Sequence, residues 1–231
     1  MKKILILLFC FMVFIFYVKA ETLELAPKAK SALLMEASTG TILYSKDIHS
    51  KHAPASMTKI MSMLLYIEAI ENGNLKWNEL IKISTHASSM GGSQIYLEAG
   101  EVMSVEDLFK GVAIASGNDA TVALAERIGG SEDHFVELMN KRAKELGLKN
   151  TNFKNASGLD AANHYSSAYD MAVMARELVK HEDVLKYTSI YETYLRENTD
   201  DKFWLVNTNK IVCLYYYKFL ESGDKNIYVN K

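Results

Sequence analysis

Cysteine and proline are both scarce in this chain of 231 residues. The two cysteines, Cys10 and Cys213, are too few for a framework of several disulfides or for a zinc or iron–sulfur centre held by thiolates. The two prolines, Pro27 and Pro54, form no proline-rich hinge that would separate domains. The sequence therefore predicts a fold that is held together by packing of a hydrophobic core.

The chain also lacks a surplus of charge of either sign. It has 26 basic and 28 acidic residues and a formal net charge of -2, so no basic excess is available to bind nucleic acid. Hydrophobic residues make up 49% and charged residues 23%, which excludes a disordered or fibrous protein. The six histidines show no metal-ligand spacing on one helix face, so no metal site is predicted.

A long apolar run occurs at the start of the chain. Residues 1–3 are basic after Met1, and residues 4–18 carry no charge. In Val18-Lys19-Ala20, Val18 and Ala20 place β-branched and small side chains at the positions that a signal peptidase reads. The run is shorter than the roughly 20 residues that a membrane-spanning helix needs. We therefore expect residues 1–20 to be a signal peptide, and the protein to be secreted or to act at the extracytoplasmic face of the cell membrane. An uncleaved anchor is the alternative.

The pattern of the remaining chain predicts strands at both ends with helices between them. Residues 31–35 and 41–45 read as a β-hairpin, because a loop that ends in glycine separates two short apolar runs. Helices are predicted after Pro54 up to residue 70, from Ser104, from about Asp119 to Gly130, from Ser131 to Gly147, and from Ser167 to Leu178. Strand-like sequence follows near residues 203–217. This order predicts an α/β fold in which one sheet contains the first and last strands.

Ser56-Met57-Thr58-Lys59 is the first pattern that could carry chemistry. Ser56 lies where the chain enters a helix, and Lys59 falls on the same helix face. A serine hydroxyl needs an adjacent base to act as a nucleophile, and a lysine can serve if burial or nearby positive charge lowers its pKa. Free N–H groups at the helix start would also face a developing oxyanion. Taken alone, the pattern is better explained as an N-cap serine followed by a surface lysine.

Ser116-Gly117-Asn118 is the second pattern, and it falls in a turn between two predicted helices. Ser116 could relay a proton between a lysine and a leaving amine, and Asn118 could hold a substrate amide. On its own this pattern, too, is better explained by structure, as a glycine turn with a helix N-cap at Asn118 or Asp119.

The order of the two patterns, together with their flanks, is more specific than either one. Ser-x-x-Lys followed by Ser-x-Asn is the active-site order of the serine penicillin-recognising enzymes. Within that group the chain resembles the low-molecular-mass D-alanyl-D-alanine carboxypeptidases, peptidase family S11. The similar segments occur in order at residues 32–44, 53–61, 91–97, 113–120, 155–160, 164–170 and 204–210.

The resemblance implies a fold like that of β-lactamases and DD-peptidases, with an antiparallel sheet, flanking helices and a helical subdomain. It implies a serine hydrolase that removes the terminal D-alanine from peptidoglycan stem peptides through an acyl-enzyme, with no metal or organic cofactor. Ser56 would be the nucleophile, Lys59 the general base, Ser116 the proton relay, and Asn118 a substrate-binding residue. β-Lactam antibiotics would be inhibitors.

The third motif of the family does not occur in these 231 residues. Lys-Thr-Gly should follow shortly after Lys210, where it would help to bind the substrate carboxylate next to a strand that supplies an oxyanion-hole N–H. The nearest candidate by position is Glu221-Ser222-Gly223. We therefore expect residues 21–231 to be a truncated DD-peptidase domain with an incomplete sheet, without the family's C-terminal β-rich domain and membrane-anchoring helix, and with impaired activity.

Two other functions stay open. An inactive truncated gene product would at most bind muropeptide or penicillin. A β-lactamase is less favoured, because the alanine-rich flanks of Ser116-Gly117-Asn118 fit the carboxypeptidases better and the sequence shows no obvious glutamate-bearing loop of the class A type.

Overall fold

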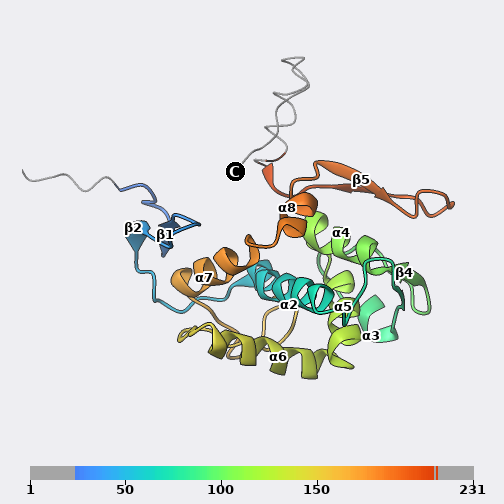
Figure 1. Ribbon diagram of the computed structural model, residues 1–231, viewed down its shortest axis with the longest axis horizontal. Coiled ribbons are helices and arrows are strands. Elements are labelled where there is room, and N and C mark those ends of the chain that lie inside the picture. The colour runs from blue at the N-terminus through green and yellow to red at the C-terminus, as the bar shows by residue number, and fades with distance from the viewer. Residues whose placement is uncertain (1–23, 211, 213–231) are drawn as a thin grey trace, which may run out of the picture. The chain divides into compact units, whose positions relative to one another are not determined.

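A computed structural model describes residues 24–210 and residue 212 of the chain (Figure 1). The predicted signal peptide, residues 1–20, and Glu221-Ser222-Gly223 lie outside the described residues. The chain divides into two units, Met1–Lys30 and Ser31–Lys231. In the described part of the first unit, the Ala29 N–H donates to the Ala26 carbonyl at 3.2 Å and closes a turn.

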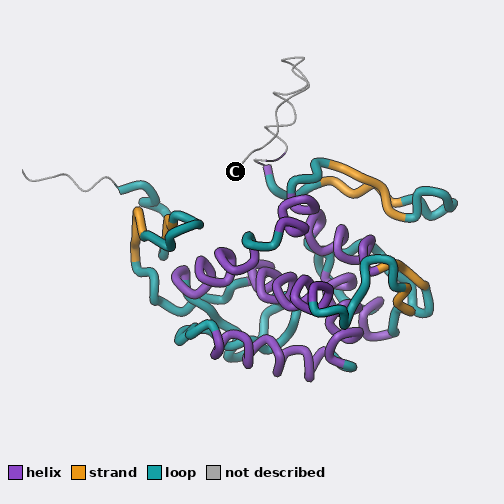
Figure 2. The backbone as a smooth tube through the Cα atoms, in the orientation of Figure 1, coloured by secondary structure: helices purple, strands orange, loops and turns teal. Residues whose placement is uncertain are grey.

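The second unit combines short strands with helices, which Figure 2 distinguishes by colour. Its described elements are β1 (Ala32–Met35), β2 (Ile42–Lys46), the 3₁₀-helix η1 (Ala55–Thr58), α2 (Lys59–Glu71), β3 (Leu80–Lys82), α3 (Thr85–Ser88), β4 (Val102–Ser104), α4 (Val105–Ala115), α5 (Asn118–Gly129), α6 (Glu132–Glu145), α7 (Ala168–Leu178), α8 (Glu182–Thr188), β5 (Glu192–Leu195) and β6 (Phe203–Val206).

The predicted β-hairpin near the start of this unit is confirmed. β1 pairs with β2 in antiparallel fashion, with Leu34 opposite Tyr44. The loop between them is organised by Glu36, which accepts hydrogen bonds from the hydroxyl and N–H groups of Thr39 and Ser38. These bonds, those from Thr39 above all, lower the pKa of Glu36 to about 2. The loop therefore closes around an ionised carboxylate.

The described strands form three separate hairpins: β1 with β2, β3 with β4, and β5 with β6. The strand order predicted one sheet that contains the first and last strands, whereas here β6 pairs with β5. The chain after β6 is tied to helices instead. The Asn207 side chain donates to the carbonyls of Thr188 and Ile190 at 3.0 and 2.7 Å, and the Thr208 N–H donates to the Ile114 carbonyl at 3.1 Å. These bonds hold this end of the β5–β6 hairpin against the ends of α4 and α8.

The helix boundaries that the sequence predicted are confirmed by their caps. The hydroxyls of Ser104, Ser131 and Ser167 each accept a hydrogen bond from the N–H three residues on, at 3.1–3.2 Å. Gly130 ends α5 in a left-handed conformation, with φ 77°. Local side-chain chemistry therefore sets where these helices begin and end.

Helix α2 lies against α4, α5, α6 and α7 (Figure 1). Its apolar side chains contribute Leu64, Tyr66 and Ile67 to the core, where Tyr66 packs against Phe135 of α6 at 5.4 Å between ring centroids. Burying a side chain of this size contributes about 1.5–3 kcal/mol. The core therefore fixes the helix whose first residue is Lys59.

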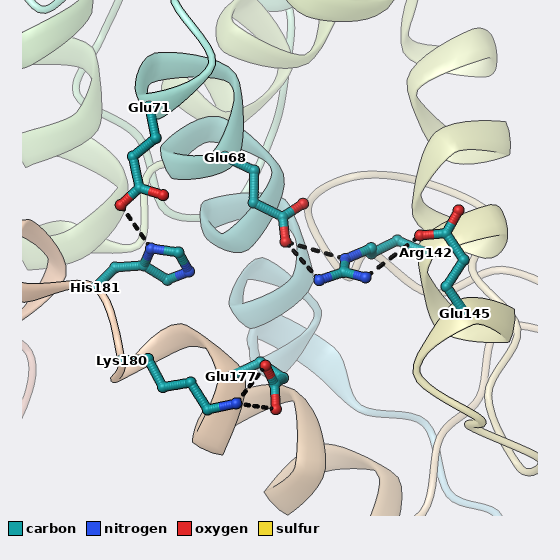
Figure 3. Close-up of polar contacts among 7 residues, drawn as sticks. All are labelled: Glu68, Glu71, Arg142, Glu145, Glu177, Lys180 and His181. Atoms are coloured by element: carbon teal, nitrogen blue, oxygen red, sulfur yellow. Dashed lines mark hydrogen bonds and ion pairs between the residues drawn. The ribbon is translucent and has the colours of Figure 1, made fainter.

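Polar contacts join the C-terminal part of α2 to α6 and to the residue before α8 (Figure 3). The Arg142 guanidinium of α6 donates from Nε and Nη2 to one oxygen of Glu68, at 3.0 and 2.7 Å, and it also lies 3.3 Å from Glu145. His181, just before α8, lies 2.7 Å from Glu71. Among the residues that the structure describes, no helix has both the length and the apolar character to cross a membrane.

Candidate active site

Ser56 and Lys59 stand on one continuous turn of backbone. η1 runs directly into α2, so Ser56 is the second residue of the 3₁₀ turn and Lys59 the first residue of the α-helix. The Lys59 Nζ lies 3.3 Å from the Ser56 Oγ. Ser56 is exposed, whereas only 2% of Lys59 is exposed. An accessible hydroxyl therefore lies beside a buried amine, and the alternative of a surface lysine is wrong.

The Lys59 amine is surrounded by oxygen acceptors. Besides the Ser56 Oγ, it donates to the Asn118 Oδ1 at 2.6 Å and to the Ser157 carbonyl at 2.7 Å. Burial lowers the pKa of Lys59 to about 8, against the opposing attraction of the Asp119 carboxylate. A lysine in this state loses its proton far more readily than a lysine in water.

Asn118, the first residue of α5, is held at both ends of its side-chain amide. Its Oδ1 faces Lys59, and its Nδ2 donates to the Gly91 carbonyl at 2.7 Å. Its backbone N–H donates to the Ser93 carbonyl at 2.7 Å. At Gly92, with φ +81°, an added Cβ would lie 2.9 Å from the Asn118 Nδ2. The tight turn at residues 91–93 therefore fits closely around the amide and fixes its orientation.

Ser116 ends α4 in the left-handed region, with φ 58° and ψ 34°. Non-glycine residues rarely adopt this conformation, and they persist there only where the surroundings impose it. In the described part of the chain the Ser116 hydroxyl makes no hydrogen bond. The structure thus joins Ser56, Lys59 and Asn118 by hydrogen bonds and places Ser116 on the adjoining turn. The catalytic roles given to all four residues stay predictions.

The family model of the D-alanyl-D-alanine carboxypeptidases, peptidase family S11, matches residues 18–223. The chain belongs to this family. It is 61% identical over 195 residues to the D-alanyl-D-alanine carboxypeptidase DacF of Bacillus subtilis (strain 168), which covers 84% of this chain and 50% of the relative. The chain spans about half the length of the curated relatives that it matches.

Solved structures of penicillin-binding proteins have the same fold as this S11 chain. Penicillin binding protein 5 of Haemophilus influenzae matches with a TM-score of 0.76 and 34% identity, over 81% of this chain and 54% of that one. Penicillin-Binding Protein D2 of Listeria monocytogenes, in its ampicillin-bound form, matches with a TM-score of 0.70 and 29% identity, over 82% and 76% of the two chains. The predicted DD-peptidase-like α/β fold is confirmed.

Asp119 is a member of this S11 site region to which the sequence analysis gave no role beyond a helix cap. Its fully buried carboxylate accepts hydrogen bonds from the N–H groups of Ile95, Leu97 and Ala120, at 2.8–3.1 Å. It therefore attaches the segment after the residue 91–93 turn to the start of α5. It also places a negative charge near Lys59.

Ser157 is the second contributor that the sequence analysis missed, although segment 155–160 carried part of the family resemblance. Its carbonyl faces Lys59, and the adjoining Ala156 is fixed by the Ser62 hydroxyl, which donates to the Ala156 carbonyl at 2.7 Å, and by Glu132, which accepts the Ala156 N–H at 2.9 Å. The Ser157 hydroxyl is buried and has no hydrogen-bond partner among the described residues. No local pattern marks a backbone carbonyl as a ligand for a distant amine.

A pocket of about 340 Å³ lies beside this loop. It is lined by Ala53, Ala55, Gly158, Leu159, Asp160, Ala161, Ala162 and His164. Within the described residues, no three His, Cys, Asp or Glu side chains form a group that could hold a metal ion.

Proposed function

We propose that this chain carries the acylation centre of a serine D-Ala-D-Ala carboxypeptidase, which removes the terminal D-alanine from peptidoglycan stem peptides. The observation that carries the proposal is the exposed Ser56 Oγ, 3.3 Å from a buried lysine amine. With a pKa of about 8 for Lys59, about one tenth of the molecules hold a neutral amine at pH 7. Membership of the S11 family supports the same reaction.

In the first step, neutral Lys59 accepts the Ser56 proton while the Ser56 oxygen attacks the carbonyl of the D-Ala-D-Ala peptide bond. The oxygen–carbon bond forms, and the carbonyl becomes a tetrahedral oxyanion. In this proposal, backbone N–H groups near Ser56 stabilise the negative charge that develops on this oxygen. The neighbouring Asn118 positions the stem peptide through the remaining hydrogen-bonding capacity of its side-chain amide.

In the second step, the carbon–nitrogen bond breaks and D-alanine leaves. Its amine needs a proton, which passes from Lys59 through the Ser116 hydroxyl in this proposal. Ser116 lies on the turn that leads into Asn118, whose side chain contacts Lys59, and this placement supports the relay. Water then attacks the ester on Ser56, releases the shortened peptide and restores the serine.

The sequence without Lys-Thr-Gly favours a second proposal for a polypeptide of these 231 residues. Losing one oxyanion-hole donor typically lowers a rate by about 10²–10³. We propose that such a polypeptide hydrolyses the peptide slowly and that its residual function is binding of muropeptide or penicillin. Residues 1–20 are proposed to be a signal peptide that directs the protein to the extracytoplasmic side, where peptidoglycan lies.

A fluorescent penicillin tests the acylation centre directly, because β-lactams react with the same serine in the proposed mechanism. The ampicillin-bound Listeria protein supports this choice of probe. We expect a lasting covalent label, located on Ser56 by mass spectrometry of a tryptic digest and absent from Ser56→Ala. An adduct on another serine would contradict the assignment of Ser56.

A further inference from the structure

Thr58 lies between Ser56 and Lys59 and makes a buried hydrogen bond to a distant histidine. Its Oγ1 is 2.8 Å from the His164 Nε2, across 106 positions of sequence. Thr58 is fully buried, and His164 is 6% exposed. The proposed reaction uses neither side chain, so this pair needs an explanation of its own.

The hydrogen bonds of His164 determine its tautomer. The Lys154 backbone N–H donates to the His164 Nδ1 at 3.1 Å, so this nitrogen carries no proton. The neutral ring then carries its proton on Nε2 and donates it to the Thr58 Oγ1. Burial lowers the pKa of His164 and favours this neutral form, although the Asp160 carboxylate acts in the opposite direction.

The segment around His164 is anchored to the chain that leads into η1. The two residues that follow it form backbone bridges, Tyr165 with Asn152 and Ser166 with His52, through hydrogen bonds of 2.8–3.1 Å. The His164 ring also packs edge-on against Phe153, at 5.9 Å between centroids. The position of the imidazole is therefore fixed, and its hydrogen bond to Thr58 can hold η1 in place.

The 3₁₀ turn η1, which carries Ser56, is not stabilised by a favourable backbone conformation or by a side-chain cap of its own. Ala55 adopts a left-handed conformation with φ 46°, which is unfavourable for a residue with a Cβ. Pro54, at the N-cap of η1, makes no side-chain capping bond. A 3₁₀ turn also has poorer hydrogen-bond geometry than an α-helix. A turn of this kind keeps its shape when neighbouring groups hold it.

We infer that His164 is a positioning residue, whose hydrogen bond to Thr58 holds η1 in the conformation that brings the Lys59 Nζ within reach of the Ser56 Oγ. This inference rests on the proposed function of the site. The hydrogen bonds of the His164 ring go to Thr58 and Lys154 and not to Ser56 or Lys59. His164 acts through Thr58, and its effect is on the geometry and the pKa of Lys59.

Four substitutions distinguish the effect of losing the hydrogen bond from the effect of changing the side-chain volume. Thr58→Val removes the acceptor at nearly constant shape, and Thr58→Ser keeps it. His164→Asn is too short to reach Thr58 but still offers an acceptor near the Lys154 N–H, whereas His164→Gln places an amide N–H close to the position of Nε2. The first measurement is the rate constant for acylation by a fluorescent penicillin. We expect Thr58→Val and His164→Asn to slow it by roughly threefold to tenfold, and the conservative variants to stay within about twofold.

The double variant Thr58→Val/His164→Asn should be no slower than either single variant, since both remove the same bond. The second measurement needs no catalysis: the NMR titration of a ¹³C-labelled Lys59 side chain. We expect its pKa to move away from about 8 in Thr58→Val and His164→Asn and to stay there in Thr58→Ser and His164→Gln.

A thermal melt identifies the variants that fold. If His164→Asn does not fold, the test of the inference rests on Thr58→Val, which changes the side-chain volume least. Folded Thr58→Val with an unchanged Lys59 titration would overturn the inference, because a merely structural bond would lower only the melting temperature. Failure of the wild-type chain to react with penicillin would count against the proposed function instead. The Lys59 titration would still decide the role of His164.

Discussion

Lys59 and Asn118 are joined by a hydrogen bond of 2.6 Å between Nζ and Oδ1, although 59 positions separate them in the sequence. The bond connects the start of α2 with the start of α5. It therefore unites two sequence patterns, each of which alone is better explained as a helix cap or a turn. Because the Asn118 oxygen is a neutral acceptor, burial dominates the pKa of Lys59.

The first prediction concerns the pH dependence of acylation. In the proposed mechanism the neutral form of Lys59 accepts the Ser56 proton, and the pKa of Lys59 is about 8. The rate of penicillin acylation should therefore rise with pH and reach half of its upper value near pH 8. Lys59→Ala should lose most labelling at every pH. A rate that does not change between pH 6 and pH 9 would remove Lys59 from the role of base.

The second prediction uses Asn118→Asp, which replaces the neutral acceptor with a carboxylate. A negative charge beside the amine favours the ammonium form, so the pKa of Lys59 should rise. An increase of one pKa unit would lower the rate of acylation at pH 7 about tenfold and move the pH midpoint upward by the same unit. Asn72→Asp adds the same charge at an exposed position at the other end of α2, and it should leave the midpoint unchanged. A midpoint that stays near 8 in Asn118→Asp would contradict this account of the site.

Local features of the fold could be predicted from the sequence because their causes are local. A serine three residues before an acidic residue, as at Ser104 and Ser167, supplies its own capping bond, and Gly130 supplies its own stop. The three-residue strands β3 and β4 were not predicted, since runs that short carry no recognisable alternation and exist only as a pair.

The residues of the site likewise divide into those that local sequence could predict and those that it could not. Ser56 and Lys59 could be placed together because helix geometry fixes the relation between residues three apart. The Ser157 carbonyl could not be placed, since it reaches Lys59 across 98 positions and depends on how a loop packs. The Thr58–His164 bond is a contact of the same long-range kind. In this sequence only the order of the family-like segments pointed to such proximity.

The third prediction concerns Gly158, which lies against η1, the turn that carries Ser56. Its φ is +90°, and an added Cβ would lie 1.9 Å from the Ala55 carbonyl oxygen. Gly158→Ala should therefore lower the free energy of unfolding by about 2–5 kcal/mol, from backbone strain and overpacking together, and slow acylation as η1 shifts. Gly73→Ala is the matched control, because Gly73 has a φ of +76° with no atom near its Cβ position. Thermal melts of both variants separate the clash from the strain. Equal losses would show that the contact with Ala55 is unimportant.

The last prediction concerns the third motif of the family. In the proposed mechanism the described site supplies a nucleophile, a base and an amide. The resemblance to the family implies that the group that binds the substrate carboxylate and one oxyanion donor would belong to a strand with Lys-Thr-Gly, which the 231 residues do not contain. All these groups act on one transition state, so the missing ones should lower turnover more than they lower weak binding.

We expect D-alanine release from a D-Ala-D-Ala peptide to be at least about 100-fold slower with the 231-residue chain than with a chimera in which the corresponding segment of the 61% identical Bacillus subtilis relative replaces the residues after Lys210. Thermal melts of both proteins show whether each is folded, and the Ser56→Ala version of the chimera is the control for background hydrolysis. Equal turnover by the two chains would show that Lys-Thr-Gly is dispensable here. A folded chimera that neither releases D-alanine nor reacts with penicillin would instead overturn the assignment of the site to Ser56, Lys59, Ser116 and Asn118.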